Sequence, residues 1–154
     1  MKPTKFVGGV GWNLISEITT EEETNTIEIT QDLNGNKFKC NEIIFFLKSV
    51  GTSSNTHSNK NAIFYLSNIN VGYLISVALN DGLTRIYTGR VNAKPLYWNV
   101  VCNNSSSDTN SGNIQGTPMN GYSLVDPIEK IDSIKIAMQA CYFGAGTKLR
   151  VYGR

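Results

Sequence analysis

The feature that most constrains this fold is an alternation of apolar and polar residues that recurs along nearly the whole chain. Ile27 and Ile29 alternate with threonine and glutamate, and Ile134 and Ile136 lie in a similar pattern near the end. Side chains of a β-strand point alternately to the two faces of its sheet, so a period of two predicts strands. No segment keeps an apolar helical stripe over three turns, and the best helical candidate, residues 14–23, favours extended structure through its Thr and Ile content. The sequence therefore predicts an all-β protein with less than about 15% helix.

The spacing of these patterns predicts how the strands are arranged. About eight to ten strands follow one another at intervals of roughly 10–15 residues, which leaves no room for helical crossovers, so the sheets should be antiparallel. The Asn-Gly-Asn turn at 34–36 and the Asn-Asp-Gly turn at 80–82 predict hairpins, because these residues tolerate positive φ. The continuous apolar run at 43–47 predicts a strand buried on both faces. We expect an antiparallel β-sandwich of jelly-roll type, with a closed barrel as the alternative.

The phase of each alternating segment predicts the hydrophobic core. Residues 73–79 are expected to form one strand whose odd-numbered side chains share a face, and Trp98 lies in phase with Leu96 and Val100. The side chains expected in the core are Ile75, Val77, Trp98, Val100, Ile134, Ile136, Leu149 and Val151.

Residues capable of catalysis or metal binding are few and dispersed. The single histidine, His57, lies in a polar loop without an evident nucleophile or acid partner. No pair of residues has metal-ligand spacing, and no nucleotide-binding glycine pattern occurs. The three cysteines show no CxxC spacing and predict free thiols. These observations predict a protein that is not an enzyme and that needs no cofactor or metal.

The charge pattern argues against several classes of partner. The net charge is +2, and the only notable basic cluster is Lys148 and Arg150 with Arg154 beyond them. Such scattered charge predicts no nucleic-acid partner. No apolar run approaches the roughly 18 residues of a membrane span, and the first ten residues do not resemble a signal peptide. We therefore expect synthesis in a cytoplasm and no membrane span.

Exposed aromatic residues provide one candidate binding patch. Tyr97 should point away from the face that holds Trp98, and it could join Tyr87 and Arg90 in a patch for sugar stacking or protein contact. The alternative is that these tyrosines are scattered over the surface or belong to a second buried face.

The chain is expected to be one domain, residues 12–154, preceded by a flexible arm at 1–11. Apolar Phe6, Val10 and Trp12 are interleaved with glycines there, which predicts an arm that docks on a neighbouring subunit. The alternative places Trp12 back on its own domain as the start of the first strand. Polar loops are expected at 51–61 and 103–116.

The last segment, 131–154, shows a specific pattern. A strand ending Ile-Lys-Ile is followed by Phe-Gly-Ala-Gly-Thr-Lys-Leu-Arg-Val-Tyr-Gly. This pattern resembles the closing hairpin of β-sandwich modules in virion proteins of tailed bacteriophages. The resemblance implies a structural role in the virion, as a tail, fibre, head-decoration or receptor-binding component, and it implies no catalytic residues.

The same resemblance implies the protein's surroundings. It implies a homo-oligomer that is located in the virion, with other virion proteins and a host-surface glycan as the expected partners. The alternative function is a free-standing, lectin-like β-sandwich that binds carbohydrate.

Overall fold

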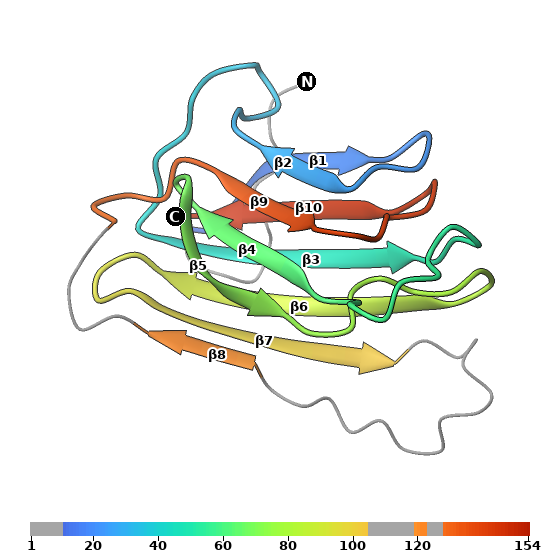
Figure 1. Ribbon diagram of the computed structural model, residues 1–154. Coiled ribbons are helices and arrows are strands. Elements are labelled where there is room, and N and C mark those ends of the chain that lie inside the picture. Colours follow the sequence, from blue (N-terminus) through green and yellow to red (C-terminus); the bar gives the residue numbers. More distant parts are fainter. Residues whose placement is uncertain (1–10, 105–118, 123–127) are drawn as a thin grey trace.

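The computed structural model describes residues 11–104, 119–122 and 128–154, which form ten β-strands and no helix (Figure 1). The strands are β1 (Asn13–Thr19), β2 (Thr26–Ile29), β3 (Glu42–Val50), β4 (Ala62–Leu66), β5 (Ile69–Leu74), β6 (Thr84–Asn92), β7 (Tyr97–Asn104), β8 (Met119–Tyr122), β9 (Ile134–Met138) and β10 (Lys148–Gly153). The prediction of an all-β protein is confirmed.

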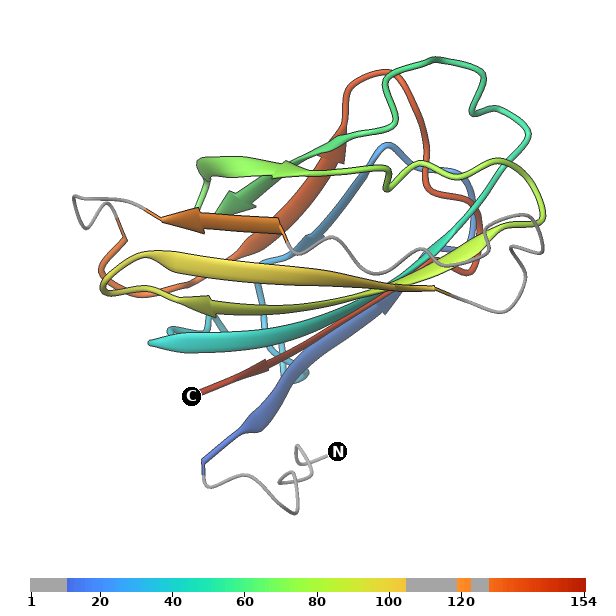
Figure 2. The same ribbon diagram turned by 90° about the horizontal axis from the view of Figure 1, so that it is seen from below.

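The strands form two antiparallel sheets that pack face to face (Figures 1 and 2). The larger sheet has the order β1-β10-β3-β6-β7-β8, and the smaller has the order β2-β9-β4-β5. The predicted β-sandwich is therefore confirmed, and a closed barrel is not what forms. The jelly-roll subtype stays a prediction, with which this strand order is consistent.

Most connections carry the chain from one sheet to the other. The glycines of both predicted turns have positive φ, 79° at Gly35 and 79° at Gly82, so the turns are where the sequence places them. Each turn nevertheless lies in a connection between the sheets, and the prediction of hairpins there is wrong. The expectation of a closing hairpin at the C-terminus is also wrong, because β9 and β10 belong to different sheets and do not pair with each other.

One hydrophobic core fills the space between the sheets. Seven of the eight predicted core side chains are buried: Val77, Trp98, Val100, Ile134, Ile136, Leu149 and Val151. The Trp98 ring meets the Phe64 ring edge-on at a centroid distance of 5.5 Å, which joins β7 of one sheet to β4 of the other. The indole N–H of Trp98 donates to the Val71 carbonyl at 3.1 Å, so the buried polar atom is satisfied.

Ile75 is the predicted core residue that the structure corrects. Its side chain is 53% exposed, and Tyr73 beside it also points outward. The strand ends at Leu74, and Ser76 has a positive φ of 55°, which interrupts the alternation. Val77 and Leu79 return to the core after this break, so a single phase does not run through 73–79.

One of the two predicted loops is found where the sequence places it, and the other is only partly described by the structure. Residues 51–61 form the connection between β3 and β4, as expected. In the second predicted loop, residues 103–104 are part of β7, and 105–116 lie outside the described residues.

Candidate interaction surface

The phase of β3 gives the six-stranded sheet an apolar outer surface. Ile43, Phe45 and Leu47 are fully buried, whereas Ile44 and Phe46 point outward and Phe46 is 40% exposed. β3 lies between β10 and β6, so these outward side chains occupy the middle of the sheet. The prediction that residues 43–47 are buried on both faces is therefore wrong, because no described element covers the outer one.

Aromatic side chains from neighbouring elements extend this surface. Tyr152 lies opposite Ile44 in the β10–β3 ladder, and its ring meets Phe46 edge-on at 6.0 Å between centroids. Trp12 completes a shallow hollow of about 80 Å³ lined by these four side chains. We call the outer surface of the six-stranded sheet, with Trp12, Ile44, Phe46, Ile86 and Tyr152 at its centre, the open face.

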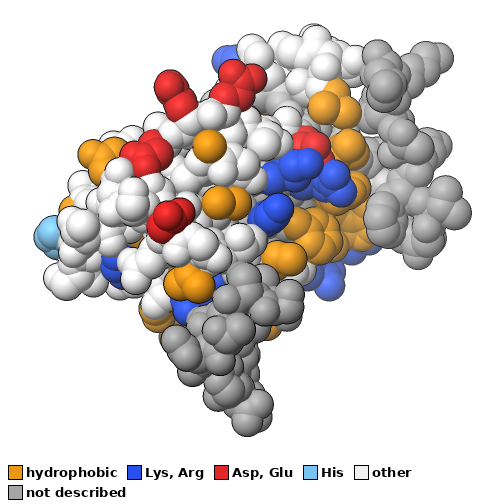
Figure 3. Space-filling model, turned by 90° about the vertical axis from the view of Figure 1, so that its right-hand side faces the viewer, with side chains coloured by type: hydrophobic (Ala, Val, Ile, Leu, Met, Phe, Trp, Pro, Cys, Tyr) orange, Lys and Arg blue, Asp and Glu red, His pale blue; other side chains and the backbone are white. Residues whose placement is uncertain are grey.

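Positive charge surrounds the centre of the open face. A second hollow of about 260 Å³ is lined by Phe46, Lys48, Ile86, Lys148 and Arg150. Figure 3 shows Lys and Arg side chains gathered beside hydrophobic ones. The described charged side chains of the face are Lys48, Arg90, Lys148, Arg150 and Arg154 with the carboxylates Glu17 and Glu42, a net charge of +3.

Two carboxylates hold four of these cations in place. Glu17 pairs with Lys148 at 3.4 Å and with Arg150, and Glu42 pairs with Arg90 at 3.2 Å and with Arg154. The hydrogen bond from Arg150 lowers the pKa of Glu17 below its ordinary value, so Glu17 is ionised at neutral pH. These pairs are solvent-exposed and add little stability, typically about 0–1 kcal/mol each. Their main effect is to order a cationic rim.

Lys48 differs from the other cations of the rim. It lies directly opposite Lys148 in the β3–β10 ladder, and among the described residues it makes no ion pair or hydrogen bond. Like charges directly opposite each other in a sheet are destabilising. A carboxylate supplied from outside the described residues would relieve this repulsion.

The structure does not bring the predicted patch of Tyr87, Arg90 and Tyr97 together on one surface. Tyr87 is fully buried, and its hydroxyl donates to the Ser76 carbonyl at 2.7 Å. Burial raises the pKa of the Tyr87 phenol above its ordinary value. The odd-numbered residues of β6 face the core, which puts Tyr87 on the opposite side of the sheet from Arg90. Arg90 and Tyr97 do lie on the open face.

A second exposed tyrosine stands beside Tyr97. Tyr122 of β8 lies opposite Tyr97 of β7, and the two side chains are 76% and 45% exposed. The Asn120 side-chain carbonyl accepts hydrogen bonds from Asn99 and, at 3.4 Å, from the Tyr97 hydroxyl. Sequence analysis missed Tyr122 because residues 119–122 show no clear alternation from which a strand could be predicted.

Of the three residues predicted to form the docking arm, only Trp12 is among the residues that the structure describes. Phe6 and Val10 lie outside the described residues. Trp12 is half-buried on its own domain, where the Arg154 guanidinium lies 4.6 Å from the centre of its ring. Trp12 thus contacts its own domain directly before β1, where cation–π contact and the adjoining apolar centre hold it on the open face. Docking of the arm on a neighbouring subunit stays a prediction.

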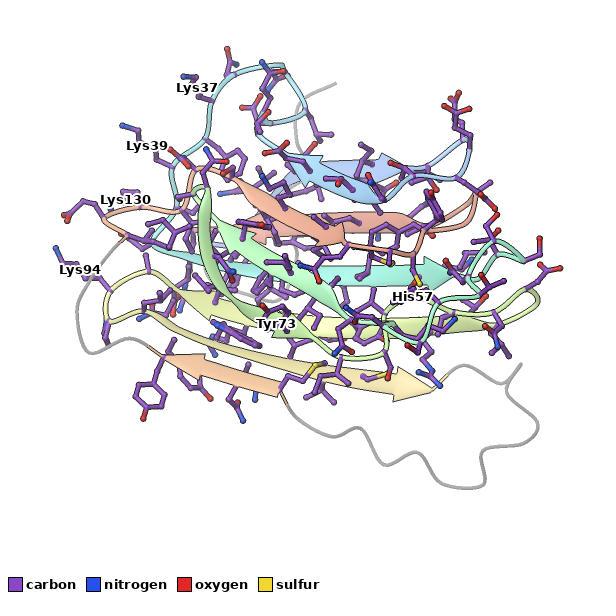
Figure 4. All side chains as sticks on the ribbon, viewed as in Figure 1. Lys37, Lys39, His57, Tyr73, Lys94 and Lys130 are labelled. Atoms are coloured by element: carbon purple, nitrogen blue, oxygen red, sulfur yellow. The ribbon has the colours of Figure 1, made fainter. Side chains whose placement is uncertain are left out.

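The single histidine and the cysteines do not gather into a group of potential metal ligands in the part of the chain that the structure describes. His57 is exposed in the β3–β4 connection, and its Nδ1 accepts the Asn59 backbone N–H at 3.0 Å (Figure 4). No group of three His, Cys, Asp or Glu side chains in the described ranges could hold a metal ion. Cys40, Cys102 and Cys141 are free thiols. Within the same ranges, no helix long and apolar enough to cross a bilayer is found.

In comparisons with known proteins, no protein-family model matches this chain and no curated protein matches its sequence.

Proposed function

We propose that this chain is a structural component of a tailed-phage particle and acts by protein–protein assembly through the open face. The observation that carries the proposal is the exposed apolar centre in the middle of a six-stranded sheet, where Phe46 is 40% exposed. Contiguous apolar surface with a polar rim is typical of protein interaction sites.

The resemblance of the C-terminal segment to virion modules supports the proposal. The pattern at 131–154 that resembles virion modules includes β10, and β10 supplies Lys148, Arg150 and Tyr152 to the open face. The proposed surroundings follow from that resemblance: synthesis in the host cytoplasm, incorporation into the virion, and other virion proteins as partners. The proposed activity needs neither catalysis nor a cofactor.

Particle composition tests the proposal. We expect peptides of this chain in density-purified particles from the cells that produce it, as measured by mass spectrometry. A Phe46→Asp variant expressed to the same soluble level should be lost from particles, because it places a charge in the apolar centre. Tyr73→Asp, a matched change on the outer surface of the smaller sheet, should be incorporated normally. If wild-type chain is absent from the particles, the proposal is wrong.

Glycan binding is a second candidate function. It is favoured by the Tyr97–Tyr122 pair, because two exposed rings beside the Asn99 and Asn120 amides offer both stacking and hydrogen bonding to a sugar. A glycan array with the isolated chain separates the candidates. Binding that disappears in Tyr122→Ala would support a host-surface glycan or a lectin-like role. Assembly through the apolar centre around Phe46 predicts that this variant, which changes only the edge strand β8, is still incorporated into particles.

A further inference from the structure

The charge of the open face restricts what can cover it. Two copies packed with their open faces directly opposed would bring two surfaces of +3 together, which is costly in a desolvated interface. Lys48, which has no ion-pair partner among the described residues, lies opposite Lys148 and adds to this restriction. A suitable occupant carries carboxylates next to an apolar group, so that both the cationic rim and the Phe46 centre are matched.

The chain itself carries such a segment in the turn between β1 and β2. Glu21 and Glu22 are exposed there and make no ion pair or hydrogen bond among the described residues. Ile18, at the end of the preceding strand, is 38% exposed. Glu23 is held differently, because its carboxylate accepts hydrogen bonds from the Thr52 and Ser54 hydroxyls, at 2.8 Å and 2.9 Å for Ser54. We call residues 20–25 the acidic turn.

The acidic turn is fixed at the same end of the sandwich as Lys48 and Lys148. The Thr20 backbone N–H donates to the Thr147 carbonyl at 2.9 Å, and the Gly146 N–H donates to the Thr20 carbonyl at 2.8 Å. Lys148 comes directly after Thr147 and lies opposite Thr19 in the β1–β10 ladder. The acidic and basic surfaces therefore adjoin on a rigid part of the molecule.

This adjacency suits a two-fold interface. In a two-fold dimer each surface patch contacts its counterpart reciprocally, so an axis running between the two patches places each acidic turn on the partner's basic patch. Phe46 and Ile86 line the same hollow as Lys48 and Lys148, so a turn docked on these lysines would also lie against the apolar centre.

We infer that the chain associates with a second copy of itself, with the acidic turn of each copy docking against Lys48, Lys148 and Phe46 of the other. The inference rests on the proposed function in one respect, the use of the open face for assembly, and it adds the identity of the partner.

Sedimentation velocity on the full chain tests the inference through charge reversal. Wild-type chain is expected to dimerise at low ionic strength and to dissociate progressively as salt screens the rim. Lys48→Glu and the double variant Glu21→Lys/Glu22→Lys should each weaken association at least about tenfold, because like charges then face each other. An equimolar mixture of these two variants should associate more tightly than either variant alone, because one contact of the mixed dimer is wild-type and the other pairs the reversed turn with the reversed charge at position 48, although Lys148 still faces that turn.

A charge reversal far from the proposed interface serves as the matched control. Lys39→Glu changes an exposed lysine at the opposite end of the sandwich and should leave dimerisation unchanged (Figure 4). A wild-type chain that stays monomeric at about 100 µM in low salt overturns the inference. So does a mixture that associates no more tightly than either variant alone, or a Lys39→Glu variant as weak as Lys48→Glu. A monomeric chain that is nevertheless found in particles would overturn this inference alone and leave the proposed function standing, with a different acidic partner.

Discussion

Replacing Trp98 by alanine is expected to lower the free energy of unfolding by about 3–5 kcal/mol. The side chain is only 3% exposed, and it bridges the two sheets through its edge-on contact with Phe64 and its hydrogen bond to Val71. Its neighbours pack closely against it, and only glycine fits at position 121, because a Cβ added there would lie 2.0 Å from the indole nitrogen. Truncation would leave a cavity that these tightly fitted neighbours fill poorly.

Denaturant unfolding monitored by circular dichroism measures this loss. Tyr122→Ala is the matched control, since it removes an aromatic ring that is 76% exposed and should change stability by less than about 0.5 kcal/mol. A loss below about 1 kcal/mol for Trp98→Ala would show that Trp98 is not enclosed between the sheets.

The second large effect is expected at Asn55, where alanine should cost about 2–4 kcal/mol. Asn55 is buried in the β3–β4 connection. Its Nδ2 donates to the carbonyls of Leu79 and Tyr142, each at 2.8 Å, and its Oδ1 accepts the Tyr142 N–H at 2.7 Å. Alanine would remove the partners that the structure gives to the Tyr142 N–H and carbonyl, and would leave the Leu79 carbonyl with the Thr52 N–H alone, at 3.1 Å.

Thermal and denaturant unfolding of Asn55→Ala should be compared with His57→Ala from the same loop. The His57 side chain is exposed and accepts one local hydrogen bond, so its removal should be nearly neutral. Equal, small losses for both variants would mean that Asn55 does not tie the three segments together.

Local periodicity predicted much of this fold because the side chains of a strand point alternately to the core and to the surface, so its own sequence shows which residues are buried. Ile134, Ile136, Leu149 and Val151 are all buried as their alternation indicates. The prediction failed at Ile75, where a single backbone feature, the positive φ of Ser76, ends the alternation. Serine carries no strong signal for that conformation, so the break was not visible in the sequence.

Topology was less predictable, because it depends on contacts between distant segments. The turns at 34–36 and 80–82 have the residues that hairpins use, yet both lead into the opposite sheet. Turn residues report the local backbone angles and not which strand pairs with which.

The candidate interaction surface could not be predicted from local sequence either. A continuous apolar run such as 43–47 predicts a strand, but it does not reveal whether another layer covers its second face. The structure leaves Ile44 and Phe46 uncovered by described residues, and it separates Tyr87 from Arg90 and Tyr97 through the phase of β6. Assignment of the surface therefore required the sheet order as well as the alternation.

Hydroxyl-radical footprinting of the chain in purified particles, compared with the dilute isolated chain, tests the use of the open face most directly. The account predicts that Trp12, Phe46 and Tyr152 are labelled much less in the particle, while Tyr65 and Tyr73 on the outer surface of the smaller sheet are labelled equally in both states. Unchanged labelling of Phe46 and Tyr152, or protection confined to Tyr65 and Tyr73, would contradict it.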